Sequence, residues 1–138
     1  MTKRRQIRRS AGTSTRGKRT PKRRKKRVSL VKKADRLFSV AIRDRDGRCL
    51  ACGARDNLQC AHIISRRYTN DGLRWDFQNA VTLCHRDHVF YTYRPLEWES
   101  WVDERFPGRL TRLKRRALGP IKKPDLEGIV RGLGGDDE

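Results

Sequence analysis

The chain has 138 residues, enough for one ordinary domain with short extensions, and this length excludes two large domains. Its 35 Lys and Arg against 16 Asp and Glu give a formal net charge of +19, and only 35% of its residues are apolar. Such a charge favours a polyanionic partner. No run approaches the roughly 18 apolar residues of a membrane span, and the amino terminus lacks the apolar stretch of a signal peptide, so we expect a soluble intracellular protein.

Residues 1–28 form the most basic part of the sequence. They carry five Lys, nine Arg and no acid, and so supply 14 of the net 19 positive charges. With only four apolar residues, the segment cannot bury enough surface to offset its ordering entropy, and its like charges repel one another. We therefore predict a disordered basic arm that binds nucleic acid phosphates through counterion release. A solubilising tail is the plainer alternative.

An amphipathic pattern begins at Leu30. Apolar residues recur there at spacings of three and four, as far as Ile42, with charged residues between them. Ser29 can cap the start of a helix and Gly47 can follow its end. The spacing therefore predicts a helix from about residue 30 to about residue 46.

The centre of the chain alternates between strand-like and helix-like segments. We expect strands at residues 58–64 and 79–83, with a loop or hairpin between them. A helix should follow over residues 84–93. Pro95 should begin another helix, because proline is tolerated in the first turn, and this helix should end at Pro107.

The carboxyl-terminal part holds a second basic surface. Residues 108–123 contain seven basic residues and no acid, and their leucines could seat a short helix. The last residues, 132–138, combine glycines with three acids and should fray. We expect an α+β protein with an arm at 1–28, one domain at 29–118 around a core at 48–93, and an extension or tail at 119–138.

A Cys-x-x-Cys turn carries the first chemical signal. Cys49 and Cys52 are followed by Gly53, and such a tight turn aims two sulfurs at one tetrahedral zinc. Cys84 is the natural third ligand. Cysteines in a chain without an export signal favour metal binding over a disulfide framework. A structural Zn²⁺ would stabilise so small a core, because metal binding free energy becomes folding free energy.

Beyond this turn, cysteine, histidine and asparagine recur in a fixed order, in the segments Cys60-Ala61-His62-Ile63-Ile64 and Asn79-Ala80-Val81-Thr82-Leu83-Cys84-His85-Arg86-Asp87-His88. The block resembles the HNH, or ββα-metal, endonucleases, particularly the zinc-stabilised form common in phages and mobile elements. The similarity covers about 40 residues between positions 48 and 88, with a phage-type continuation at 73–76 and 95–98. It implies a small ββα-metal (HNH, His-Me finger) core stapled by zinc, with flanking helices, in the host cytoplasm if a phage encodes it.

The resemblance also implies roles for single residues. His62 corresponds to the general base, Asn79 to the central asparagine, and His88 to a ligand of the catalytic divalent ion. A histidine suits the removal of a proton from water at neutral pH, and a divalent ion would offset the charge that develops on the phosphate. The Asn79 amide could pin the loop or orient the imidazole. Three arginines near the base are candidate phosphate clamps that would bind DNA: Arg66, Arg67 and Arg74.

Two positions differ from the family pattern. Asp87 stands where the family has a zinc cysteine, and Ala61 stands where it often has Asp or His. Because a carboxylate oxygen can bind zinc, Asp87 can complete a site with the three cysteines. The chemical alternatives for this fourth ligand are His85, Cys60 and His88.

The sequence therefore predicts a metal-dependent DNA endonuclease that hydrolyses phosphodiester bonds, with a structural Zn²⁺ and a catalytic Mg²⁺ or Mn²⁺. DNA should be contacted at its phosphate backbone by the basic arm and the core. A noncatalytic zinc-dependent DNA-binding module on the same scaffold is the alternative, and Ala61 and Asp87 favour it. A structural or ribosome-associated RNA-binding protein would also fit the arm, but His62, Asn79 and His88 together argue against it.

Overall fold

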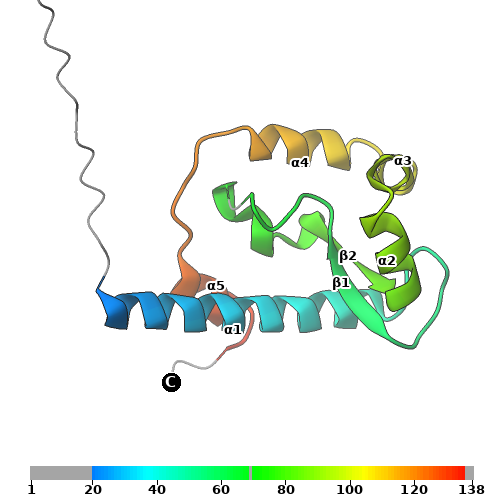
Figure 1. Cartoon of the computed structure of the whole chain (residues 1–138). Coiled ribbons are helices and arrows are strands. Elements are labelled where there is room, and N and C mark those ends of the chain that lie inside the picture. The colour runs from blue at the N-terminus through cyan, green and yellow to red at the C-terminus, as the bar shows by residue number, and fades with distance from the viewer. Residues whose placement is uncertain (1–19, 69, 136–138) are drawn as a thin grey trace, which may run out of the picture.

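Five α-helices and a two-stranded antiparallel sheet make up the part of the chain that the computed structural model describes, residues 20–68 and 70–135 (Figure 1). The fold is of mixed α+β class, as predicted. The helices are α1 (Pro21–Asp46), α2 (His85–Thr92), α3 (Pro95–Arg105), α4 (Arg109–Ala117) and α5 (Leu126–Gly132). The strands are β1 (Leu58–His62) and β2 (Ala80–Cys84), joined through two short 3-10 helices, η1 (Asn70–Trp75) and η2 (Phe77–Asn79).

Helix α1 begins earlier than the amphipathic pattern of the sequence. The side chain of Thr20 caps it, and Pro21 occupies its first turn. Lys and Arg are good helix formers, and their turns add to an amphipathic helix that is already nucleated. The prediction of a disordered arm is therefore wrong for residues 21–28, whereas residues 1–19 lie outside the described residues. Gly47, in the left-handed conformation at φ 67°, ends the helix as predicted.

The strands pair with Leu58 opposite Cys84 and His62 opposite Ala80. Successive side chains of a strand face opposite sides, so the sheet contributes to two different clusters. α1 covers one face, and α4 lies on the other side of the sheet from α1 (Figure 1). α1 is held to β2 by Asp46, whose Oδ2 accepts the backbone N–H of Thr82 at 2.9 Å.

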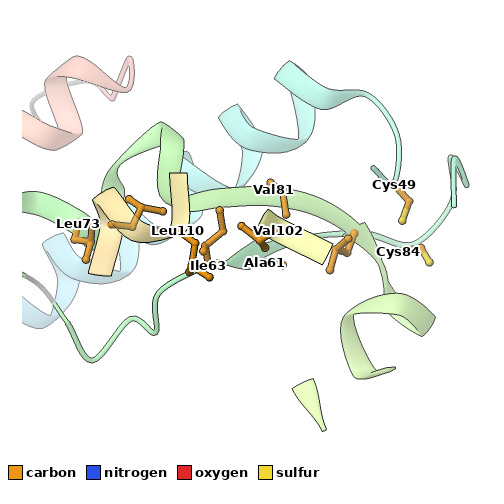
Figure 2. Packing of buried hydrophobic residues seen from close by; sticks show 10 residues of the cluster. Cys49, Ala61, Ile63, Leu73, Val81, Cys84, Val102 and Leu110 are labelled. Carbon is orange, nitrogen blue, oxygen red and sulfur yellow. The ribbon is translucent and has the colours of Figure 1, made fainter. Parts of the chain in front are cut away.

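Two hydrophobic clusters form the core. The first lies on the side of α3 and α4, and its buried residues are Cys49, Ala61, Ile63, Leu73, Val81, Leu83, Cys84, Val102, Leu110 and Leu113. Figure 2 shows Cys49 and Cys84 together at one end of this cluster. The second lies between the sheet, α1 and α5, and its buried residues are Ala34, Phe38, Ile42, Trp75, Ala80, Leu126 and Val130.

The segment 119–138 was predicted as an extension or tail, and part of it is folded. Leu126 and Val130 of α5 are buried against α1, and Asp125 caps α5 by accepting the backbone N–H of Gly128 at 3.1 Å. The helical spacing of the apolar residues between Leu126 and Leu133 is the signal that would have revealed this helix. Residues 136–138, expected to fray, lie outside the described residues.

The remaining elements lie near their predicted positions. β1 ends at His62, two residues early, and β2 is shifted by one residue. α3 begins at Pro95, and α4 confirms the short basic helix. None of the described helices has the length and apolar character needed to cross a membrane.

Candidate functional site

Three cysteines and an aspartate meet at one end of the first cluster. The ligating atoms of Cys49, Cys52, Cys84 and Asp87 all lie within 4.8 Å of one another. The two sulfurs of Cys52 and Cys84 are 3.7 Å apart, and Cys49 Sγ lies 3.2 Å from Asp87 Oδ2. A tetrahedron with Zn–S bonds of about 2.3 Å has edges of about 3.8 Å, so the four groups fit one zinc ion. No other such group occurs within residues 20–68 and 70–135.

The Cys-x-x-Cys turn supplies two of these groups. The backbone N–H of Gly53 donates to the carbonyl of Cys49 at 2.8 Å, and the N–H of Cys49 donates to the carbonyl of Ala54 at 2.8 Å. Gly53 adopts φ 80°, a left-handed conformation that favours glycine. The reversal keeps both sulfurs on one side, with Cys49 buried and Cys52 exposed.

The start of α2 supplies the other two groups. Cys84 is the cap of α2, and its sulfur accepts the backbone N–H of Asp87 at 3.5 Å. Hydrogen bonds from Cys52 first, and from the other two thiols, hold the pKa of the Asp87 carboxyl below its usual value. The structure therefore brings Asp87 to the three cysteines, and it does not bring His85, Cys60 or His88 there. The predicted Cys₃Asp set is confirmed as a potential metal site compatible with structural zinc.

His62 lies at the end of β1 and faces α1, where its ring stacks on Phe38 with centroids 5.6 Å apart. Its Nε2 is 2.8 Å from the carbonyl oxygen of Arg74. A carbonyl only accepts, so Nε2 carries the proton and Nδ1 keeps its lone pair. Burial is the main cause that lowers the pKa of His62. The imidazole is therefore neutral at pH 7 and able to accept a proton through Nδ1.

His88 of α2 is oriented by Gln59 of β1. Its Nδ1 lies 2.7 Å from Gln59 Oε1, which accepts the N–H and leaves Nε2 with a lone pair. The amide nitrogen of Gln59 lies 3.0 Å from Nδ1 of His85, so one side chain joins two histidines. Burial first, and His85 second, lower the pKa of His88. Sequence reasoning missed Gln59, because a single glutamine in a strand carries no motif.

His62 and His88 line the same two adjoining hollows, which together we call the histidine cleft. The larger, of about 500 Å³, also borders on Asp35 and Ser39 of α1. The smaller, of about 210 Å³, extends to Trp98 of α3. The structure thus brings together the predicted base and the predicted ligand of the catalytic ion.

Cys60 lies in this cleft and apart from the other three cysteines. Burial raises the pKa of its thiol to about 11. The thiol is therefore protonated at neutral pH, and it is available as a matched control for the clustered cysteines.

Asn79 is fully buried. Its Oδ1 accepts the backbone N–H of Ile64 at 2.7 Å, and its Nδ2 donates to the carbonyls of Leu73 at 2.9 Å and Ile64 at 3.1 Å. These bonds tie both ends of the loop that follows His62. Asn79 fulfils the loop-pinning role expected of it and makes no hydrogen bond to the His62 ring among the described residues.

The three candidate clamp arginines differ in position. Arg66 lines the cleft, with 59% of its side chain exposed and its guanidinium in an ion pair of 3.9 Å with Asp35. Arg67 is exposed and lines neither hollow. The guanidinium of Arg74 is held by both carboxylate oxygens of Asp35, at 2.6 and 3.0 Å. Arg66 is therefore the best placed of the three to meet a phosphate.

Ala61 belongs to the first hydrophobic cluster, with 2% of its surface exposed, and it also lines the smaller hollow of the cleft. It faces away from α1, because neighbouring residues of a strand face opposite sides. Asp35 is the only carboxylate among the described residues that line the cleft, and it already accepts hydrogen bonds from Arg74 and Trp75. His88 is thus the one cleft side chain left free to bind a divalent ion in the manner predicted.

Comparisons of the chain with protein-family models, with curated proteins and with solved structures gave no match. The functional inference therefore depends on the motif in the sequence and on the geometry of the metal cluster and the histidine cleft.

Proposed function

We propose that the chain is a metal-dependent DNA endonuclease of the HNH type, with His62 as its general base. One observation carries the proposal: His62 and His88 line one cleft, and in each ring the protein engages one nitrogen and leaves the other free. A base and a metal ligand need this division of the two ring nitrogens.

In the proposed reaction, Nδ1 of His62 removes a proton from the attacking water, while the Arg74 carbonyl holds the ring in place. The exposed Arg66 lies where its charge would bind the scissile phosphate. His88 would hold a divalent cation through Nε2, and the ion would offset the charge that develops on the phosphate and the leaving oxygen.

The order of the elements supports the same proposal. β1 is followed by the loop that Asn79 holds, then by the antiparallel strand β2 and by α2, which carries His88. This is the order of elements that a ββα unit would have. The Cys₃Asp cluster lies at the junction of β2 and α2. A zinc ion bound there would fix the start of the helix that presents His88.

One feature favours the alternative of a noncatalytic zinc-dependent DNA-binding module. Ala61 lines the smaller hollow but its methyl group offers no ligand, so only His88 among the cleft side chains is free to bind a catalytic ion. Such a module would retain the zinc cluster and the basic surfaces.

Plasmid cleavage separates the two functions. Purified protein is incubated with supercoiled DNA and with RNA, in Mg²⁺, Mn²⁺ or no divalent ion. A nuclease should nick or linearise the DNA, and His62→Ala should lower the rate by about 10² to 10⁴, the usual contribution of a positioned base. Cleavage by His62→Ala at the wild-type rate would reject this site. Binding of DNA without cleavage in any metal would support the noncatalytic module.

A further inference from the structure

We propose that one outward stripe of α1 is a track for duplex DNA that leads into the histidine cleft. The stripe consists of Lys22, Lys25, Lys32 and Arg36, and we call it the α1 basic stripe. All four side chains are exposed. This inference rests on the proposed nuclease function, because it assigns the path of the substrate toward His62 and His88.

Helix geometry places the four residues in line. At about 100° per residue they fall within about 80° of arc, and Ser29 lies among them. The buried residues Ala34, Phe38 and Ile42 occupy the opposite side of α1. The stripe therefore points away from the core along its whole length of about 21 Å, at about 1.5 Å per residue.

The stripe borders the cleft. Asp35 and Ser39, which line the larger hollow, lie on the side of α1 next to Lys32 and Arg36. From there the helix extends past the sheet toward its amino-terminal end (Figure 1). A polyanion whose scissile phosphate enters the cleft can therefore continue along the stripe.

The four charges are not used within the described structure. None of the four has a hydrogen bond or an ion pair with another residue of 20–68 or 70–135. By contrast, Lys26, one turn after Lys22, lies 3.4 Å from Glu127 of α5. Unpaired cations in a row repel one another, and phosphates would relieve this repulsion while releasing counterions.

The form of the stripe favours a duplex over a single strand. Sites for single-stranded nucleic acid combine charge with aromatic side chains on which bases stack. No aromatic residue occurs in α1 before Phe38, so the stripe offers no stacking surface. A straight, rigid row of cations suits a stiff rod of regular charge, and about 21 Å corresponds to about six base pairs at 3.4 Å each.

The test measures how salt affects the binding of a 24-base-pair duplex, in full-length protein that carries His62→Ala so that the DNA stays intact. The stripe variant adds Lys22→Gln, Lys25→Gln and Lys32→Gln. The control adds Arg112→Gln, Arg115→Gln and Lys122→Gln, three exposed cations on α4 and the loop after it, none of which lines the cleft. Both variants lose three positive charges. Circular dichroism checks that both variants fold.

The stripe variant should reduce the slope of log K against log salt by about 2.7, since each phosphate contact contributes about 0.9. The control should reduce it by less than about 1. An unchanged slope in the stripe variant, or an equal reduction in the control, would overturn the proposal. Weaker binding of single-stranded DNA or RNA with unchanged duplex binding would also overturn it, in favour of another nucleic acid.

A cleavage map separates this proposal from the nuclease proposal. With His62 restored, the enzyme should cut short end-labelled duplexes only where about six base pairs remain on one side of the cut, and the stripe variant should cut nearer to that end. Absence of any cleavage would reject the nuclease and leave the slope measurement to decide on the stripe. Cleavage equally close to both ends in the wild type would reject the stripe alone.

Discussion

The carbonyl oxygen of Arg74 accepts a hydrogen bond from Nε2 of His62 at 2.8 Å. The side chain of the same residue is bound by Asp35, which also accepts the indole N–H of Trp75 at 3.0 Å. One carboxylate of α1 therefore fixes the segment whose backbone orients the candidate base.

Asp35→Ala should destabilise the fold. It leaves the partly buried guanidinium of Arg74 and the indole N–H of Trp75 without their acceptor, which costs about 1 to 3 kcal/mol of unfolding free energy. Asp44→Ala, at an exposed position of the same helix, is the control and should change stability by less than about 0.5 kcal/mol. Urea denaturation measures both. Equal urea midpoints for the two variants would mean that the hydrogen bonds of Asp35 to Arg74 and Trp75 do not stabilise the fold.

Arg66 and Arg74 should differ in their contribution to DNA binding. Arg66→Ala should reduce the salt slope of duplex binding by about 0.9, because its side chain is 59% exposed and its guanidinium makes only a 3.9 Å ion pair with Asp35, so it can meet a phosphate. Arg74→Ala should leave the slope unchanged and lower the melting temperature, because its guanidinium is engaged by Asp35. If Arg74→Ala reduced the salt slope and Arg66→Ala left it unchanged, Arg74 would be the residue that binds phosphate.

Zinc should be integral to the fold. We expect about one zinc ion per chain by elemental analysis, and Cys49→Ser should lower the melting temperature by about 10 °C or more. Cys60→Ser is the matched control, since Cys60 lies outside the metal cluster, and it should keep its zinc. A folded wild-type sample without zinc would contradict the assignment.

The same measurement tests the fourth ligand. Asp87→Ala should weaken zinc retention against a chelator, and Asp87→Cys should restore it, because a thiolate can replace the carboxylate. Full retention by Asp87→Ala would point to a water ligand or another side chain.

The pH dependence of cleavage should report His62. Only its neutral form accepts a proton, and burial lowers its pKa below the ordinary value of 6.5. The charged groups that act on it, after burial, are Arg66 and Arg74, which lower its pKa, and Asp35, which raises it. The rate should therefore decline as pH falls, with its midpoint below the ordinary histidine value of 6.5. A decline centred above pH 7 would indicate another base.

Gln59 should act through His88. Gln59→Ala removes the acceptor that orients the ring, so half-maximal activity should need about 10 to 100 times more Mn²⁺, with the rate recovering at saturation. Gln59→Glu keeps an acceptor for His88 and should behave nearly as the wild type. His85→Ala is the control for the second bond of the amide and should change little. A lower rate at saturating Mn²⁺ in Gln59→Ala would indicate a role other than metal binding.

Several features could be predicted from the sequence because they depend on local spacing. The Cys-x-x-Cys turn ending in Gly53 predicts two of the metal ligands from local spacing, whereas Asp87 was one of four candidates for the fourth ligand, and the structure selects it by bringing two segments together. The β-compatible composition of the two segments likewise located β1 and β2 within two residues.

Other features depend on contacts between distant segments. The pairing of Gln59 with His88 and the engagement of Arg74 by Asp35 join residues 29 and 39 positions apart. The early start of α1 reflects cooperative extension of a helix that the core already stabilises, which composition alone does not reveal. α5 was overlooked although its spacing was visible, because the surrounding glycines and charges suggested a tail.

Ala61 lines the smaller hollow beside His62 and His88, so this position bears on how such a site could gain or lose activity over evolution. An acidic or imidazole side chain at this position would border the hollow that His88 also lines and could supply a second ligand, but it would displace packing at a buried position of the first cluster. Ser39 and Ser65 already border the cleft, on α1 and on the loop after β1. A carboxylate introduced at either serine would reach the open side of the site, so these two positions are where selection, or a designer, could change metal affinity while leaving the core intact.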